Sequence, residues 1–302
     1  MRRLLLFLSR QKGLRSWMET SRLARRVSSR FVAGETLAEA MAVSRRVNRE
    51  GISITLDHLG ENVTSLEEAA SSRDVYLEAL DQLSKNGIQG NVSLKLSQFG
   101  IDLSEDACRS NVEQLVRRAA EIKSFVRVDM ENSDYTDRTL HLVTDLHVRV
   151  GSVGTVIQAY LHRSAADVAT LCHKGIRVRL CKGAYLEPPD RAFSEKADVD
   201  RNFVTLMQTL LTLGIHPAIA THDPRMIAET KRFARERQIE PERFEFQMLY
   251  GIRRDLQRRL VAEGYRLRLY IPFGKAWYPY FMRRLAERPA NLLFLARNLW
   301  RD

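Results

Sequence analysis

Polar side chains stand at the ends of eight short apolar segments of this 302-residue chain. If the segments are parallel strands, their carboxyl ends meet at one face and bring these side chains together in a single site. An Asp at such a place is also an ordinary helix N-cap, so the prediction rests on the whole set. The set is Asp57, Lys95, Asp129, Gln158, Arg179 with Lys182, Thr221 with His222, Gln247 and Tyr270.

The charges in this set favour an anionic organic ligand. A metal site needs several His and carboxylate ligands that converge, whereas three of these side chains, Lys95, Arg179 and Lys182, are cations. A Schiff-base lyase that uses Lys95 is an alternative, and it requires a depressed lysine pKa.

A second polar pattern is Tyr280-x-x-Arg283-Arg284-x-x-Glu287. Positions i, i+3, i+4 and i+7 of a helix share one face, which is normally apolar where it meets a core. Here that face carries two guanidinium groups, and one guanidinium can hold a carboxylate through two parallel hydrogen bonds. The alternative is a solvated face on which Glu287 pairs with Arg283 or Arg284.

The elements that must position these groups alternate between strand and helix patterns. A helix is predicted over 36–50, and eight strand–helix units in about 250 residues then match a (β/α)8 barrel. An open doubly wound sheet is the alternative, but the first strand is followed by Asp57-His58-Leu59-Gly60-Glu61-Asn62, without the usual glycine-rich phosphate turn. The predicted strands are 52–57, 91–96, 125–129, 155–158, 176–181, 217–220, 244–248 and 266–272. The predicted helices that follow them are 71–83, 110–122, 137–148, 164–172, 200–213, 224–238, 253–262 and 277–286.

Charge is concentrated at the N-terminus. The formal net charge is +11, and residues 1–34 hold nine Lys/Arg against one acid, Glu19. The rest of the chain is nearly neutral, so a nucleic-acid partner is not expected. We predict a basic helical segment over 1–50 and the barrel over 51–302. Leucines on the other side of the basic segment suggest peripheral contact with an anionic membrane surface, and an organelle transit peptide is the alternative.

Cysteine usage and hydropathy place further limits on the protein. The three cysteines, Cys108, Cys172 and Cys181, have no metal-ligand spacing and indicate reduced thiols, with no metal site. No apolar run approaches the ~20 residues of a transmembrane helix. We therefore expect a cytoplasmic protein, with peripheral contact to the inner face of the cell membrane as a hypothesis.

Taken together, these motifs resemble the proline dehydrogenase family. The resemblance rests on Tyr280-x-x-Arg283-Arg284-x-x-Glu287 with Arg179-Leu180-Cys181-Lys182-Gly183-Ala184-Tyr185. Further matches surround Lys95, Asp129, Gln158, His222, Gln247 and Tyr270, and they extend over about 31–291. The length resembles the single-function bacterial enzymes.

The resemblance implies a distorted (β/α)8 barrel whose last helix lies above the barrel mouth, with extra N-terminal helices. It implies Asp129 and Arg179 as catalytic residues. It assigns substrate binding to Lys95, Leu249, Tyr270, Tyr280, Arg283 and Arg284. It assigns flavin binding to Met130, Gln158, Arg179, Lys182, Gly183, Ala184, Lys196, Thr221, His222, Gln247, Arg284 and Glu287. A weaker implication is that Glu61 pairs with Arg179 as a gate.

The implied reaction is the oxidation of L-proline to Δ1-pyrroline-5-carboxylate, the first step of proline degradation to glutamate. The implied cofactor is FAD, with FMN as the alternative, and the electrons would pass to a quinone. A pyrroline-5-carboxylate dehydrogenase is a further implied partner. Arginine suits the proline carboxylate because it stays charged when buried.

Overall fold

Eight parallel strands close into one barrel in the computed structural model, which describes residue 21 and residues 28–287, with side chains up to 282. Neighbours in sequence are neighbours in the barrel, and β1 closes the ring by pairing with β8. The predicted barrel is therefore confirmed, and each strand lies within two residues of its predicted bounds. The strands are β1 (Ser53–His58), β2 (Gly90–Leu94), β3 (Val126–Val128), β4 (Val153–Gln158), β5 (Arg177–Cys181), β6 (Ala218–Ala220), β7 (Glu245–Leu249) and β8 (Leu267–Phe273).

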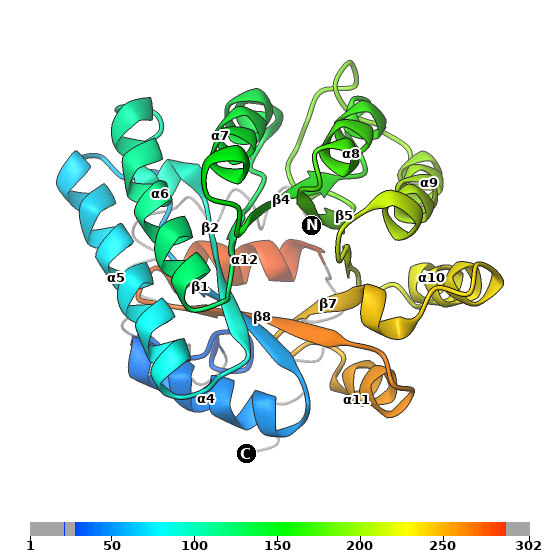
Figure 1. Ribbon diagram of the computed structural model, residues 1–302, viewed down its shortest axis with the longest axis horizontal. Coiled ribbons are helices and arrows are strands. Elements are labelled where there is room, and N and C mark those ends of the chain that lie inside the picture. Colours follow the sequence, from blue (N-terminus) through cyan, green and yellow to red (C-terminus); the bar gives the residue numbers. More distant parts are fainter. Residues whose placement is uncertain (1–20, 22–27, 288–302) are drawn as a thin grey trace.

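Helices surround the barrel (Figure 1), and a buried apolar core fills the space between ring and strands. Short 3-10 turns follow β2, β3 and α10, at Leu96–Phe99, Ser133–Tyr135 and Pro241–Arg243. The helices are α4 (Leu37–Arg49), α5 (Leu66–Lys85), α6 (Glu105–Glu121), α7 (Thr136–Arg149), α8 (Ser164–His173), α9 (Lys196–Leu213), α10 (Pro224–Glu236), α11 (Arg254–Ala262) and α12 (Trp277–Glu287).

Two helices begin five residues before their predicted starts, and side-chain caps explain the difference. The Ser65 side chain accepts a hydrogen bond from the backbone N–H of Glu68 at the start of α5, and Ser104 does the same for Ala107 at α6. Such caps satisfy amide groups that have no partner within the helix. The sequence Ser65-x-x-Glu68 is typical of a helix N-terminus, so the start of α5 could have been predicted from the sequence.

The last helix, α12, crosses the barrel instead of standing in the ring (Figure 1). Its Trp277, Tyr280 and Phe281 form an apolar cluster with Leu59 and Ile252, which follow the carboxyl ends of β1 and β7. The helix therefore lies over the end of the barrel where the strands finish, as expected.

An N-terminal helix takes the place that α12 leaves in the ring. Helix α4 packs against β1, β8 and α5, on the outside of the seam where the barrel closes. The chain just before it is fixed to the seam as well, because the Ala33 N–H donates to the carbonyl of Pro272 at 2.8 Å. The part of the chain before the proposed boundary at residue 50 thus includes one helix of the barrel wall. The basic segment ahead of residue 28 lies outside the described residues, Ser21 excepted.

None of the described helices is both long enough and apolar enough to cross a bilayer. Cys108, Cys172 and Cys181 form no disulfide bond within the described part of the chain.

Leu80→Ala should lower the free energy of unfolding by about 2–5 kcal/mol, because Leu80 on α5 is fully buried and its loss opens a cavity. Leu66→Ala on the same helix is the matched control, since Leu66 is 45% exposed. It should change stability by less than about 0.5 kcal/mol. Urea unfolding curves measure both, and equal losses would contradict the packing described.

Candidate active site

A chain of hydrogen bonds joins four strands inside the carboxyl end of the barrel. The Tyr270 hydroxyl on β8 lies 2.6 Å from Asp57 Oδ2 on β1 and 3.0 Å from Asp129 Oδ2 just after β3. Asp129 Oδ1 accepts a charge-assisted hydrogen bond from Arg179 Nη1 on β5 at 2.8 Å. Burial, followed by the charges of Asp129 and Asp57, raises the pKa of Tyr270 well above its usual value. The hydroxyl therefore stays protonated, and its single hydrogen is shared between these two carboxylates.

Two residues that the sequence did not single out complete this network. The Ser93 hydroxyl on β2 donates to Asp129 Oδ1 at 2.5 Å. The Tyr76 hydroxyl, fully buried on α5, donates to Asp57 Oδ1 at 3.1 Å and lies 2.8 Å from the backbone carbonyl of Ser93. Ser93 shares a strand face with Lys95, since side chains alternate along a strand. This two-residue spacing from Lys95 could have predicted that Ser93 belongs to the site. Nothing in the helical pattern around Tyr76 distinguished it from an ordinary core aromatic.

Lys95 lies among carboxylates at the same end of the barrel. Its ammonium is 3.4 Å from Asp57 Oδ2 and 3.7 Å from Glu61 Oε1. Burial alone would lower the pKa of Lys95, but Asp57, Glu61 and Asp129 outweigh burial and raise it. The side chain therefore remains a cation, which argues against a Schiff-base lyase. Glu61 approaches Lys95 here, while Arg179 pairs with Asp129, so the suggested pairing of Glu61 with Arg179 is absent from the described ion pairs.

Two side chains of this site, Arg179 and Gln158, have buried polar atoms without a hydrogen-bond partner among the described residues. Arg179 is 6% exposed, and its Nε and Nη2 have no partner among the described residues. The Gln158 amide donates to the backbone carbonyls of Met130 and Glu131, which leaves its Oε1 without a partner in that part of the chain. Buried groups of this kind are costly unless a ligand or water satisfies them. The arrangement thus offers guanidinium donors and an amide acceptor to a polar ligand.

The loop after β5 approaches the site with little room for a side chain. Gly183 has a φ of +112°, and a Cβ there would lie 2.3 Å from the Tyr160 ring. Neighbouring Lys182 is held by Asp200 on α9 and Asp223 before α10, at 2.5 and 2.9 Å. These contacts fix the loop backbone close to the ends of β5 and β6.

The other predicted flavin contacts form a group around α9 and β6. Lys196 is exposed and donates to Asp200 at 2.5 Å, while Thr221 Oγ1 accepts from the Asp223 N–H at 3.0 Å. His222 Nε2 accepts from the Leu249 N–H at 3.0 Å, which fixes the imidazole beside β7. Ala184 is half-buried in the loop after β5.

The remaining predicted residues lie at the carboxyl-end mouth of the barrel, deeper inside the barrel, or on α12. Met130, Leu249 and Tyr280 lie there, with Leu249 packed on the cluster that contains Tyr280. Gln247 instead donates its amide deeper in the barrel, to Glu245 Oε1 at 2.5 Å. Arg283, Arg284 and Glu287 belong to α12, but their side chains are outside the described part of the structure.

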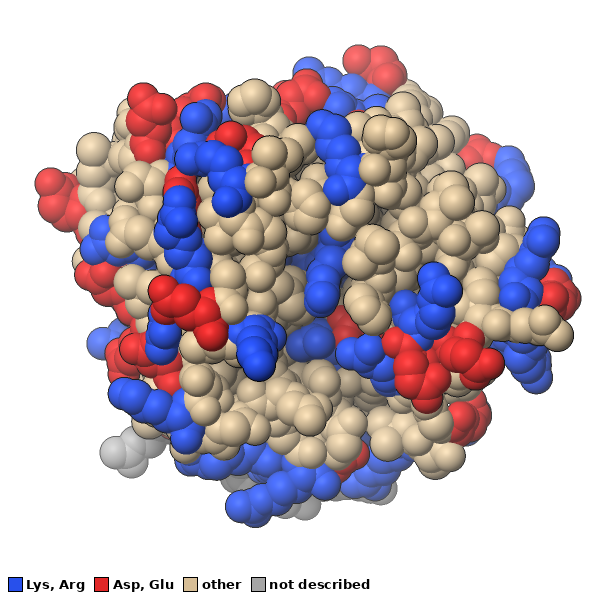
Figure 2. Space-filling model, in the orientation of Figure 1, with Lys and Arg blue, Asp and Glu red and all other residues tan. Residues whose placement is uncertain are grey.

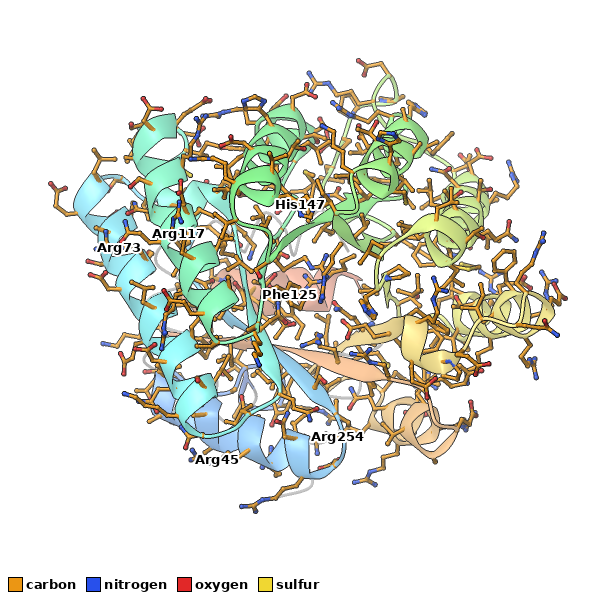
Figure 3. The ribbon with its side chains drawn as sticks, in the orientation of Figure 1. Arg45, Arg73, Arg117, Phe125, His147 and Arg254 are labelled. Carbon is orange, nitrogen blue, oxygen red and sulfur yellow. The ribbon has the colours of Figure 1, made fainter. Side chains whose placement is uncertain are left out.

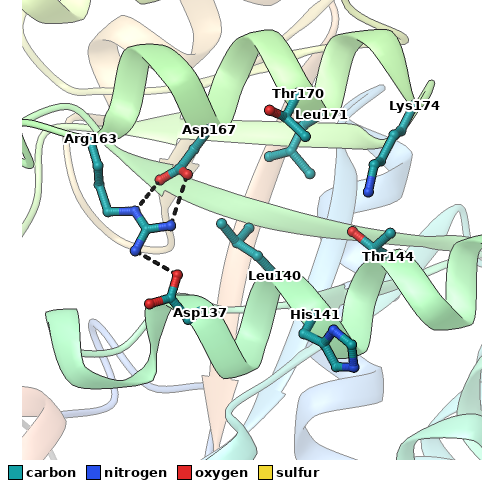
Figure 4. A pocket seen from close by; sticks show the side chains of 9 residues that line it. All are labelled: Asp137, Leu140, His141, Thr144, Arg163, Asp167, Thr170, Leu171 and Lys174. Atoms are coloured by element: carbon teal, nitrogen blue, oxygen red, sulfur yellow. Dashed lines mark hydrogen bonds and ion pairs between the residues drawn. The ribbon is translucent and has the colours of Figure 1, made fainter.

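A separate surface pocket of about 260 Å³ lies between α7 and α8 (Figure 4). Its guanidinium, Arg163, is held by Asp137 at 2.7 Å and Asp167 at 2.8 Å, so its charge is already neutralised. These helices stand in the outer ring, so the pocket lies outside the barrel of strands. Among the side chains that the structure describes, no group of three or more His, Cys, Asp or Glu is arranged to hold a metal ion.

The fold and the mouth together define a (β/α)8-barrel enzyme whose site combines buried cations with carboxylates. A family model described as proline dehydrogenase matches residues 40–297. The chain belongs to this family and is an enzyme of the proline dehydrogenase class. It is 39% identical to proline dehydrogenase 1 of Bacillus subtilis (strain 168), with 99% of each chain covered. It is 41% identical to proline dehydrogenase of Deinococcus radiodurans, with 90% of each covered.

A solved structure supports the same assignment. The barrel superposes on proline utilization A from Bdellovibrio bacteriovorus, inactivated by N-propargylglycine, with a TM-score of 0.81 and 29% identity. The match covers 87% of this chain and 32% of that chain. The likeness therefore concerns one part of a much longer protein.

Tyr270→Phe should destabilise the protein by about 1–3 kcal/mol, because it removes the donor between Asp57 and Asp129 and leaves two buried carboxylates facing each other. Tyr265→Phe is the matched control, since no hydrogen bond of the Tyr265 hydroxyl to a described residue is present. Its effect should stay below about 0.5 kcal/mol in the same urea titration. A Tyr270→Phe variant as stable as the control would refute the bridging role.

Proposed function

We propose that this enzyme oxidises L-proline to Δ1-pyrroline-5-carboxylate with FAD as its cofactor, FMN being the alternative, and that a quinone takes the electrons. The observation that carries the proposal is Arg179, which is fixed by Asp129 through one nitrogen and has two buried nitrogens without a partner in the described part of the chain. Membership in the proline dehydrogenase family supports the substrate.

The residues at the mouth fit a flavin. Arg179 offers N–H donors to an electron-rich ring edge, and Gln158 offers an acceptor to a ring N–H. The tight glycine at 183 lets backbone come close to a bound ring system. The residues that would hold the cofactor are Met130, Gln158, Arg179, Lys182, Gly183, Ala184, Lys196, Thr221, His222 and Gln247, with Arg284 and Glu287 from α12.

When bound, the flavin supplies the redox chemistry by accepting the hydride of the proline ring and returning electrons to a quinone. The protein binds and orients the substrate. Lys95 stays cationic because Asp57 and Glu61 raise its pKa, and together with Arg283 and Arg284 it would hold the proline carboxylate.

Tyr270, Tyr280 and Leu249 provide the walls of the substrate site. Tyr280 on α12 is 5% exposed within the apolar cluster that includes Trp277 and Phe281. Leu249 and Tyr270 pack against that cluster. Such walls exclude water and strengthen the attraction between the carboxylate and its cations. Fixing the carboxylate at one end presents the ring in a single orientation, which lowers the entropic cost of the reaction.

Purified protein should show the absorption of an oxidised flavin, which should bleach when L-proline is added without oxygen. D-Proline is the matched control and should leave the spectrum unchanged, because its ring cannot meet the same face when its carboxylate is held. A quinone added afterwards should restore the colour. Protein that binds neither FAD nor FMN would overturn the proposal.

Arg284→Met should lower kcat/KM for proline by at least about two decades, because a buried charge-assisted hydrogen bond to the carboxylate is lost. The control is Arg258→Met on α11, an exposed arginine whose loss should leave kcat/KM within about twofold. Near-normal activity of a folded, flavin-loaded Arg284→Met enzyme would remove Arg284 from the carboxylate site.

A further inference from the structure

A second polar cavity, of about 110 Å³, opens at the opposite end of the barrel, where the strands begin. Figure 2 shows a hollow near the centre of this face with basic side chains in it, and Figure 3 shows Phe125 at the same place. Phe125 directly precedes β3. The lining residues are Phe125, Arg127, Arg177, His216, Phe244, Glu245, Arg266 and Arg268.

Positive charge is in excess in this cavity. Three guanidinium groups surround the single ring of Phe125, with Arg127, Arg177 and Arg268 at 5.1, 5.0 and 5.7 Å from its centroid. Arg268 alone among the four lining arginines has an ion pair with a described residue, to Glu245 at 2.8 Å. Cation–π contacts recover only part of the cost of bringing like charges together.

Arg127 is the most deeply buried of these cations. It is 1% exposed, and its Nη1 donates to the backbone carbonyls of Thr155 and Arg177 at 2.9 and 2.8 Å. Its Nε has no partner among the described residues. Burial, followed by the charge of Arg179, lowers the pKa of Arg127 well below its usual value. Arg127 thus has no direct ion pair with a described residue, and a buried guanidinium in that state is costly unless an anion binds it.

The one carboxylate in the cavity is already engaged. Glu245 accepts hydrogen bonds from Arg268 Nε at 2.8 Å and from Gln247 at 2.5 Å. Although burial opposes ionisation, Arg268 and these hydrogen bonds outweigh it and lower the pKa of Glu245 to about 2. Glu245 is therefore ionised at neutral pH, but its one ion pair is with Arg268, and Arg127, Arg177 and Arg266 have no ion pair with any described residue.

We propose that this cavity is a binding site for a small oxyanion of the phosphate type, held by Arg127 and Arg177 with Arg266 at the rim. Guanidinium groups bind such oxygens through paired, charge-assisted hydrogen bonds. The volume exceeds the ~30 Å³ share of one water molecule severalfold, so it admits a small anion with some water. The bound anion neutralises the entrance of the barrel and stabilises the folded chain.

The site is distinct from the mouth that the proposed proline oxidation uses. The mouth begins one layer further along the barrel, with Asp129, Arg179 and Gln247, each two positions along the chain from Arg127, Arg177 and Glu245. Loss of anion binding would therefore leave the proposed function untouched, and a colourless protein would leave the anion site untouched.

The test is calorimetric titration of the full-length, flavin-loaded protein with sodium phosphate at constant ionic strength. Phosphate should bind at one site, and low-millimolar phosphate should raise the melting temperature by about 2 °C or more. In the double variant Arg177→Gln/Arg266→Gln, the Kd should rise at least about tenfold, while kcat/KM for proline should change by less than about twofold. A titration with AMP distinguishes free phosphate from a phosphate carried by a nucleotide.

The control is Arg117→Gln/Arg232→Gln, which removes the same charge from exposed positions on α6 and α10. It corrects for the general stabilisation of folded proteins by phosphate. If the double variant does not fold, Arg266→Gln alone serves, because Arg266 is exposed. The proposal is overturned if phosphate acts no differently from chloride on the wild type, or if the cavity variant retains the affinity of the control.

Discussion

The buried ion pair between Asp129 and Arg179, with Tyr270 and Asp57 hydrogen-bonded to it, is the interaction on which the mouth of this barrel depends. It connects β1, β3, β5 and β8, and Tyr76 on the outer helix α5 joins it through Asp57. Each member is held from at least one other side, so the cost of burying the charges is offset by several hydrogen bonds. The pair fixes Arg179 in one position, and its free donors are therefore ready for a ligand before that ligand arrives.

The interior of the barrel is polar along much of its length, which is unusual for a fold whose interior is normally filled by branched apolar side chains. One layer holds Arg127, Arg177, Glu245 and Arg268, and the next holds Asp129, Arg179 and Gln247. Apolar packing is provided instead between the strands and the helices, where Leu80 and its neighbours form the main core. The main apolar core thus lies outside the ring of strands, whereas the polar groups of the candidate site lie inside it.

The sequence predicted the strands well because each is a short apolar run bounded by turn residues. It also singled out Asp129, Arg179 and Tyr270, because polar side chains at the ends of parallel strands meet at one face of a barrel. The partnership of Asp57 with Tyr270 was beyond reach, because the register of β1 against β8 pairs residues more than 200 positions apart. The alternation Arg177-x-Arg179 and Arg266-x-Arg268-x-Tyr270 also indicates a polar barrel interior. From these two segments, only Arg179 and Tyr270, which lie nearer the mouth, were predicted as site residues.

Helix α4, which precedes the first strand, affects the order in which the barrel can fold. Because α12 lies over the mouth, the wall beside β1 and β8 is completed by α4, which comes before the first strand. During synthesis α4 can pack against β1 and α5 early, but the part of its surface that contacts β8 stays uncovered until β8 has been made. Closure depends on contacts between the two ends of the chain, which makes it a late and entropically costly step. The same contacts hold the N-terminal helix α4 against β8 near the C-terminus. Detaching either of these elements exposes the seam between β1 and β8.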